Sequence, residues 1–360
     1  MILNRRFRIL VVSLGLLLIL TMLCTPVRVA GPSMRPGLVE GQVLVATSTI
    51  LRHPARNDLV VFSEPDTGTT ALKRVVGLPG EEVLLQDGDL YLDGRRYARP
   101  IHRAQDLVPL VDTGARDADL CFALREAGFE AEGDRWFLGG ASHARLRQTL
   151  RTGYLLAGEE HFSVEPARDV GVEVDFQLHA AESVFELAIL ERDLVFSVQL
   201  ADFGRRLRIS MADPHREQVL QETELDQETP SGTLFLGNTD GGLTVSLQGQ
   251  VLADHLPYEV PAQPGENGAS RHPFAQIEVG GQGPLSLGGV RIGRDFFWRE
   301  EDGRYASGRA LELGENEFFL LGDDSWNSRD SRNYGPVRRE HVQGIVTWRI
   351  WPPGKPGLGW

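Results

Sequence analysis

The chain has 360 residues, of which 41% are hydrophobic and 24% are charged, a composition typical of a protein that buries a core. Its 37 lysines and arginines are outnumbered by 50 aspartates and glutamates, so we predict no nucleic-acid partner. The two cysteines, Cys24 and Cys121, exclude a disulfide framework and a cysteine-based zinc site. The nine histidines are scattered singly, and we predict neither a metal site nor a cofactor.

The charge is distributed unevenly, and this predicts two units. Residues 101–298 hold 31 acidic side chains against 16 arginines, whereas the rest of the chain is slightly basic. Lysine is rare: the sequence contains only two, Lys73 and Lys355. Lys355 lies in the tail of residues 352–360. A buried lysine can lose its proton and act as a base, whereas an arginine stays charged. Lys73 is therefore a candidate general base.

The amino terminus carries an apolar segment flanked by positive charges. Residues 9–27 contain no charged side chain, and a helix of this length would cross the apolar core of a bilayer at about 1.5 Å per residue. The three arginines within residues 1–8 predict that this end is cytoplasmic and that the rest of the chain lies outside. The alternative is a cleaved secretory signal with its cut after Ala30, and we favour the anchor.

Short apolar runs broken by Gly, Pro, Asn and Asp predict antiparallel strands after this segment. The first are expected at 42–46, 58–62, 71–76, 82–85 and 89–92, with Asp-Gly pairs at two turns. Two more are expected near the carboxyl end, at 317–321 and 344–351. We therefore predict an all-β unit made of residues 28–100 and 299–351, with residues 101–298 inserted into it.

The insertion has its own strand pattern. After short helices expected near 119–127 and 141–150, strands are predicted at 171–179, 184–190, 194–200, 206–211, 218–224, 233–236, 243–247 and 274–279. This spacing predicts a β-sandwich, and the segment Val290 to Asp295 resembles the end of laminin-G or concanavalin-like sandwiches. Such a domain would either bind an unidentified carbohydrate or protein ligand or serve as structure alone, because a sandwich fold does not determine function.

Three short motifs carry groups that suit hydrolytic chemistry. Residues 31–36 (GPSMRP) include a serine five residues beyond Arg28. Residues 71–81 (ALKRVVGLPGE) include Lys73 within an apolar strand, where desolvation would lower its pKa. Residues 321–337 (LGDDSWNSRDSRNYGPV) form a polar loop that alone would also suit calcium, although its arginines make a cation site less attractive.

Together these motifs resemble the signature boxes of bacterial type I signal peptidases, the leader peptidases. The family's boxes read S-M-x-P, K-R-V-V-G-x-P-G-E and G-D-N-x-x-N-S-x-D-S-R-x-W-G-x-V, and all three occur here in that order behind the same kind of anchor. The resemblance covers residues 9–99 and 311–351. It implies an antiparallel β-sheet catalytic core with one N-terminal transmembrane helix, into which the sandwich-like domain is inserted.

The resemblance also implies a serine endopeptidase that removes N-terminal signal peptides from exported preproteins without a cofactor. Ser33 would be the nucleophile, and Lys73 would be the general base that takes its proton. The backbone N–H of Ser33 would donate a hydrogen bond to the oxyanion. Ser328 would hydrogen-bond the lysine amine and orient it. The remaining supporting residues would fix the loop around the lysine: Asp330, Arg332 and Asp323.

The substrate would be held in shallow apolar pockets that admit only small side chains at the first and third positions before the cut. The implied pocket residues are Val29, Gly31, Met34, Leu38 and Leu72. Gly31 stands where many members have a serine as a second oxyanion donor, so we expect less stabilisation from that side. Gly37, Asp324 and Tyr334 replace the usual threonine, asparagine and tryptophan, but none of these changes removes a reacting group.

These features predict a single-pass protein of the inner or plasma membrane, anchored by residues 9–27, with residues 1–8 in the cytoplasm. Its catalytic domain would lie on the periplasmic or extracytoplasmic face. Its partners would be signal-peptide-bearing preproteins and the lipid bilayer. The alternative is an anchored carbohydrate- or protein-binding module, formed by the insertion, with a specialised or decayed peptidase core. The intact motif residues argue against decay.

Overall fold

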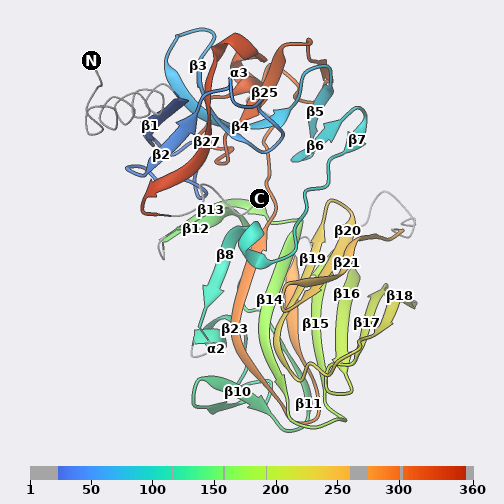
Figure 1. The fold of residues 1–360 in the computed structure, drawn as a ribbon. Helices are drawn as coiled ribbons and strands as arrows, with labels where there is room; N and C mark the ends of the chain where they lie inside the picture. The colour runs from blue at the N-terminus through green and yellow to red at the C-terminus, as the bar shows by residue number, and fades with distance from the viewer. Residues whose placement is uncertain are drawn as a thin grey trace, which may run out of the picture. The chain divides into compact units, whose positions relative to one another are not determined.

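The regular structure of the described residues is nearly all β, and the chain divides into two compact units (Figure 1). The computed structural model describes residues 23–114, 117–156, 159–191, 193–259, 275–300 and 303–353. Unit 1 contains Met1–Tyr97 and Phe296–Trp360, and unit 2 contains Ala98–Asp295. The prediction of an all-β protein is confirmed.

The apolar segment predicted at residues 9–27 lies mostly outside the described residues. Within the described part of the chain, no helix is both long enough and apolar enough to cross a membrane. The end of the segment forms strand β1 (Cys24–Arg28), which pairs with β2 (Val43–Thr47) through Val27 and Leu44. The predicted helix end at residue 27 is therefore wrong, because the backbone there makes sheet hydrogen bonds with β2.

Unit 1 is built around a seven-stranded antiparallel sheet. Its strands, in spatial order, are β1, β2, β27 (Val342–Trp351), β3 (Leu59–Ser63), β4 (Thr70–Gly77), β25 (Glu317–Leu321) and β26 (Val337–Arg338). A smaller sheet contains β24 (Leu311–Glu312), β5 (Glu82–Gln86), β6 (Asp89–Leu92) and β7 (Arg95–Arg96). In the seven-stranded sheet, strands that precede unit 2 in the sequence therefore lie beside strands that follow it.

Strand β3 is buried on both faces, and this fixes the core of unit 1. Successive side chains of a strand point to opposite faces. Val60 and Phe62 accordingly pack in one apolar cluster with Val75 and Leu320, whereas Leu59 and Val61 belong to a second cluster. Lys73 of β4 lies directly opposite Val60 in the register, so this lysine is in the middle of the buried sheet.

Unit 2 consists of two larger sheets around one core. One contains β21 (Gln250–Pro257), β20 (Gly242–Leu247), β19 (Ser231–Thr239), β14 (Val170–Leu178), β23 (Leu285–Arg294), β10 (Arg135–Leu138) and β9 (Glu130–Glu132), with β8 (Val108–Thr113) also paired to β23. The other contains β11 (Ala141–Arg145), β22 (Gln276–Gln282), β15 (Val184–Glu191), β16 (Leu194–Ala201), β17 (Arg206–Ala212) and β18 (Glu217–Glu224). Strands β12 (Arg151–Leu156) and β13 (Glu159–Pro166) form a separate pair.

The two large sheets of unit 2 face each other as a β-sandwich. Alternate residues of β14 (Val172, Val174 and Phe176) and of β15 (Phe185, Leu187 and Ile189) enter the same apolar core. The rings of Phe176 and Phe185 stack across the sheets with their centroids 5.0 Å apart. The proposed likeness to laminin-G or concanavalin-like domains stays a prediction.

Among the residues that the structure describes, the helices are short. The described helices are η1 (Ala104–Asp106), α2 (Ala118–Cys121), α3 (Ser331–Tyr334) and η3 (Arg339–His341). The helix predicted near 119–127 is only α2, and the one predicted near 141–150 is wrong, because Ala141–Arg145 is strand β11. There His143 pairs with Gly280 of β22, and only Ala144 of this strand is buried, as the two-residue period of an edge strand requires.

A buried ion pair joins the two ends of unit 2 in the sequence, through its second residue, Arg99, and its last, Asp295. Arg99 Nε donates a hydrogen bond to Asp295 Oδ1 at 2.8 Å, and the two side chains are only 3% and 9% exposed. The backbone N–H of Asp295 donates to the carbonyl of Asp169 at 2.7 Å, which holds the end of β23 beside β14. Removing one partner of a buried pair leaves the other charge without compensation, which costs about 3 kcal/mol or more.

We expect Asp295→Ala to destabilise unit 2 by about 3 kcal/mol, because it leaves the Arg99 guanidinium buried without its carboxylate. Hydrogen exchange measured on the full chain should show protection in β14 and β23 reduced by about a hundredfold. Asp112→Ala is the matched control, because that carboxylate is 63% exposed. Unchanged protection in Asp295→Ala would contradict this account.

Candidate active site

Ser33 and Lys73, which the sequence singled out separately, meet in unit 1. The amine of Lys73 lies within hydrogen-bond distance of Ser33 Oγ, at 2.8 Å. Lys73 comes from β4, and Ser33 comes from the turn between β1 and β2. The same amine donates to the carbonyl of Leu72 at 3.1 Å. A serine hydroxyl and a lysine amine in contact are the arrangement that proton transfer to a base requires.

The environment of Lys73 favours its neutral form. The residue is 4% exposed, and this burial lowers the pKa of its amine. The carboxylates of Asp330, Glu64 and Asp323 act in the opposite direction, and Arg332 acts with the burial. Burial is the largest effect, so the net direction is a lowered pKa. A neutral amine at 2.8 Å can accept the proton of the serine hydroxyl.

The turn that carries Ser33 is held by apolar side chains on both sides of the serine. Met34 and Leu38 are almost fully buried in one cluster with Val29, and Leu72 packs against it. The backbone N–H of Leu38 donates to the carbonyl of Met34 at 2.7 Å, which closes the turn. Four of the implied pocket residues therefore surround the serine, and their role in substrate binding stays a prediction.

Gly31 has a backbone conformation that explains its residue type. Its φ of 78° lies in the left-handed region, which is strained for any residue with a side chain. A Cβ at this position would meet no atom within 4 Å, so the constraint comes from the backbone and not from a neighbour. A serine donor at this position would require a different local turn.

Asp323 is held by an arginine that the sequence analysis did not assign. Arg74, the neighbour of Lys73 on β4, donates to both oxygens of Asp323 from Nε and Nη2, at 2.8 and 2.7 Å. Both side chains are almost fully buried, and Arg74 Nη1 also donates to the carbonyl of Asn57. The pair fixes the start of the third motif to the strand of the lysine. Arg74 follows Lys73 directly in the second motif, and that position was the sequence feature that could have identified it.

Asp330 and Arg332 form the second buried pair. Arg332 donates from Nε and Nη2 to the two oxygens of Asp330, each at 2.9 Å. Asp330 also accepts the backbone N–H of Gly322 at 3.0 Å and caps α3 by accepting the N–H of Arg332. The loop is therefore closed on itself immediately beside the dyad.

Ser325 is a further hydrogen-bond partner of Arg332, and the sequence analysis did not identify it as a site residue. Its hydroxyl accepts hydrogen bonds from Arg332 Nη1 at 2.7 Å and from the backbone N–H of Arg299 at 2.8 Å. Trp326, the next residue, stacks on Phe297 with ring centroids 5.8 Å apart. The segment after unit 2 in the sequence thereby supports the loop of the third motif.

Ser328 lies beside Ser33 but without the contact that the resemblance implies. Its hydroxyl is buried and has no hydrogen-bond partner among the described residues, so a bond to the Lys73 amine is not formed in this structure. A Cβ on Gly322 would lie 2.1 Å from Ser328 Oγ and 2.6 Å from the carbonyl oxygen of Ser33. Only glycine at position 322 leaves room for both the Ser328 side chain and the Ser33 carbonyl.

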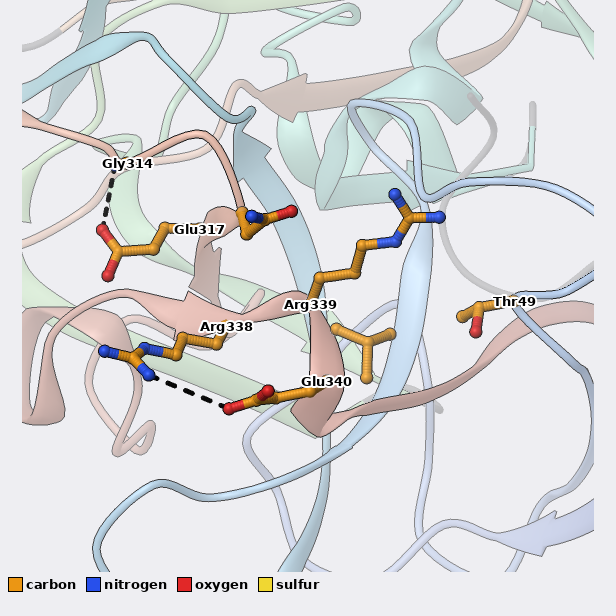
Figure 2. A pocket seen from close by; sticks show the side chains of 8 residues that line it. Thr49, Gly314, Glu317, Arg338, Arg339 and Glu340 are labelled. Carbon is orange, nitrogen blue, oxygen red and sulfur yellow. Dashed lines mark hydrogen bonds and ion pairs between the residues drawn. The ribbon is translucent and has the colours of Figure 1, made fainter.

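A separate groove of about 690 Å³ lies elsewhere in unit 1 (Figure 2). It is lined by Thr49, Gly314, Asn316, Glu317, Arg338, Arg339, Glu340 and Val342. In it Glu317 accepts the N–H of Gly314, and Arg338 lies 3.9 Å from Glu340. The groove contains neither Ser33 nor Lys73, so it is distinct from the candidate active site. Within the described ranges, no three acidic, histidine or cysteine side chains are arranged to hold a metal ion.

A family model matches the parts of the chain that hold the candidate active site. The signal peptidase family, peptidase S26, matches residues 3–136 and 293–351. Signal peptidase I of Bacillus licheniformis is 34% identical over 86 residues, which are 23% of this chain and 46% of that protein. Signal peptidase I of Streptococcus pneumoniae serotype 4 is 33% identical over 161 residues, which are 40% of this chain and 73% of that protein.

The chain belongs to the peptidase S26 family of signal peptidases. It spans about half the length of the first curated relatives that it matches. A carbohydrate-binding module of Bacillus subtilis, CBM66, aligns with 52% of this chain and 94% of its own, at 8% identity and a TM-score of 0.28. That similarity is too low to carry an argument about unit 2.

We expect Gly322→Ala to destabilise unit 1 by about 1–3 kcal/mol, because the new Cβ would displace Ser328 or the Ser33 backbone. Chemical denaturation of the purified full-length protein measures the effect. Gly314→Ala is the control, because its Cβ would first meet the flexible end of Glu317 at 3.2 Å. Equal stability in the two variants would rule out this role for Gly322.

Proposed function

We propose that the protein is a membrane-anchored serine endopeptidase that removes N-terminal signal peptides from exported preproteins. Ser33 would be its nucleophile and Lys73 its general base. The observation that carries the proposal is the 2.8 Å contact between Ser33 Oγ and an amine whose burial lowers its pKa. Membership of the signal peptidase family supports the choice of substrate class.

The first half of the reaction would form an acyl-enzyme. The Lys73 amine takes the proton from Ser33 Oγ while the oxygen attacks the carbonyl carbon of the scissile bond. The carbonyl oxygen becomes an oxyanion, to which the backbone N–H of Ser33 donates a hydrogen bond. The tetrahedral intermediate then collapses, and the ammonium of Lys73 gives its proton to the departing amine of the mature protein.

The second half would release the signal peptide. Lys73, neutral again, takes a proton from a water molecule, and the hydroxide attacks the acyl carbonyl carbon. The ester bond to Ser33 breaks, and Lys73 returns the proton to Ser33 Oγ. The same amine therefore acts as base and acid twice, which requires that its position relative to Ser33 is kept throughout. The buried pairs Arg74–Asp323 and Asp330–Arg332 would provide that rigidity.

The apolar residues around the serine support cleavage after small side chains. Val29, Met34 and Leu38 are packed in a closed cluster, and Leu72 is only partly buried beside them. A wall of this kind selects by exclusion, because a large substrate side chain would have to displace buried residues. We therefore propose that alanine-sized side chains are accepted at the first and third positions before the cut.

The anchor that we propose is the apolar run from residue 9 up to the start of β1. Ser33 follows the end of β1 by five residues, so the nucleophile would lie close to the outer surface of the bilayer. A signal peptide's cut site also follows its own apolar segment closely. Membrane anchoring would therefore bring the serine and the scissile bond to a similar depth.

We expect Ser33→Ala and Lys73→Met each to lower kcat for preprotein cleavage by about a thousandfold or more, because each removes one of the two reacting groups. Cleavage is measured by gel or mass spectrometry on purified full-length protein. The matched controls, Ser48→Ala and Lys355→Met, change the same residue types outside the dyad and should cleave like the parent. Unimpaired turnover by either dyad variant would refute the assignment.

We also expect kcat/KM to rise with pH until Lys73 loses its proton. Because burial lowers the pKa of this amine, the midpoint of the rise should lie below 10.5, the ordinary value for lysine. The sign follows from the mechanism, in which only the neutral amine can act as the base. A pH–rate profile measured between pH 5 and pH 10 tests this, and a rate that is independent of pH over that range would oppose it.

A further inference from the structure

Arg329 links the third motif to the turn between β3 and β4. Its Nη1 lies 2.5 Å from Glu64 Oε2, and its Nη2 lies 2.8 Å from Asp66 Oδ2. Glu64 belongs to the tight β3–β4 turn, where its backbone N–H donates to the carbonyl of Thr69 at 2.9 Å. Arg329 stands between Ser328 and Asp330 in the sequence, so this link is made beside the dyad.

The position of the Arg329 side chain is further restricted by an aromatic ring. Its guanidinium lies over Tyr334, 5.4 Å from the ring centroid. Burial raises the pKa of the Tyr334 hydroxyl, so this ring stays neutral. Glu64 is 14% exposed, whereas Asp66 is 55% exposed. Glu64, the less exposed of the two, is the carboxylate that raises the pKa of Lys73.

The charges around Lys73 come from three segments. Arg74 is its neighbour on β4, Glu64 follows β3, and the third motif supplies Asp323, Asp330 and Arg332. Each carboxylate of this set has its own arginine: Asp323 pairs with Arg74, Asp330 with Arg332, and Glu64 with Arg329. An unpaired carboxylate here would favour the ammonium form of the lysine and so oppose its use as a base.

We propose that Arg329 is a positioning residue whose ion pair with Glu64 weakens the pull of that carboxylate on Lys73 and so keeps the amine available as a base. The proposal rests on the function of Lys73 proposed above. It assigns a role to a residue that touches neither Ser33 nor the substrate. It also gives the β3–β4 turn a part in the chemistry, because Glu64 is the partner that makes Arg329 necessary.

The size of the effect follows from exposure. The pairs Arg74–Asp323 and Asp330–Arg332 are almost fully buried, whereas the Arg329 side chain is 47% exposed and is partly screened by water and salt. Removing the Arg329 charge should therefore raise the pKa of Lys73 by about half a unit to one unit. The acid limb of the pH–rate profile would move to higher pH by the same amount.

The scarcity of lysine allows a direct measurement. Full-length protein that carries [ε-13C]lysine has two labelled side chains, Lys73 and Lys355, and a Lys355→Arg background leaves one NMR signal to titrate. In that background, we expect Arg329→Gln to raise the pKa of Lys73 and Glu64→Gln to lower it. The double variant should titrate close to the parent, because both charges of the pair are then absent.

Two further variants separate charge from structure. Arg329→Lys keeps the positive charge but adds a second lysine, so it is followed by the pH–rate profile, whose acid limb should stay within a few tenths of a pH unit of the parent. Arg338→Gln removes another exposed arginine of unit 1, one that pairs with Glu340 in the groove of Figure 2, and should not change the pKa of Lys73. If Arg329→Gln does not fold, the opposite shift expected for Glu64→Gln still tests the proposal.

An unchanged Lys73 titration in both Arg329→Gln and Glu64→Gln would overturn the proposal. A lower kcat at every pH, without movement of the acid limb, would also overturn it, because that result indicates a purely structural role. The NMR titration needs no turnover. A parent protein that cleaves no preprotein would therefore contradict the proposed function while the titration still decides the role of Arg329.

Discussion

The desolvation of one amine governs the arrangement of unit 1. Lys73 lies in a buried strand opposite Val60, with its amine 2.8 Å from Ser33 Oγ, and its burial outweighs the pull of the nearby carboxylates. Those carboxylates cannot be left unpaired, because each would favour the charged lysine. Three arginines form ion pairs with these carboxylates: Arg74, Arg332 and Arg329. The polar third motif is therefore organised as a set of compensated charges around an apolar site.

The sheet of unit 1 holds the site together although unit 2 is inserted in the middle of its sequence. Strand β27 pairs with both β2 and β3, and β25 pairs with β4, so segments from before and after unit 2 share hydrogen bonds. The entropic cost of closing the chain grows only slowly with the length of the connection. The first residues after unit 2 contribute directly, because the Arg299 N–H and the Phe297 ring contact Ser325 and Trp326 of the third motif.

The sequence predicted strands from regular alternation and from short apolar runs bounded by turn residues. The run 171–179 matches β14 closely, because the apolar Val172, Val174, Phe176 and Leu178 alternate with other residues there. Strand β23 contains adjacent glycines at 288 and 289, so most of its length gave no periodic signal. The segment 141–150 was assigned as helix, but pairing with β22 decided its conformation. Tertiary hydrogen bonds override weak local preferences in such segments.

The sequence by itself determined the all-β class, the family and the small set of chemically capable residues, because strand periodicity and three motifs are local properties. It also isolated Lys73 as a candidate base, since this is the one lysine that an arginine-rich chain keeps in a strand. Only the tertiary structure decided which charges pair. Arg74 meets Asp323 across 249 residues and Arg329 meets Glu64 across 265, and such contacts depend on strand register and on the path of two loops. Register is fixed by the packing of the whole sheet, which no local pattern encodes.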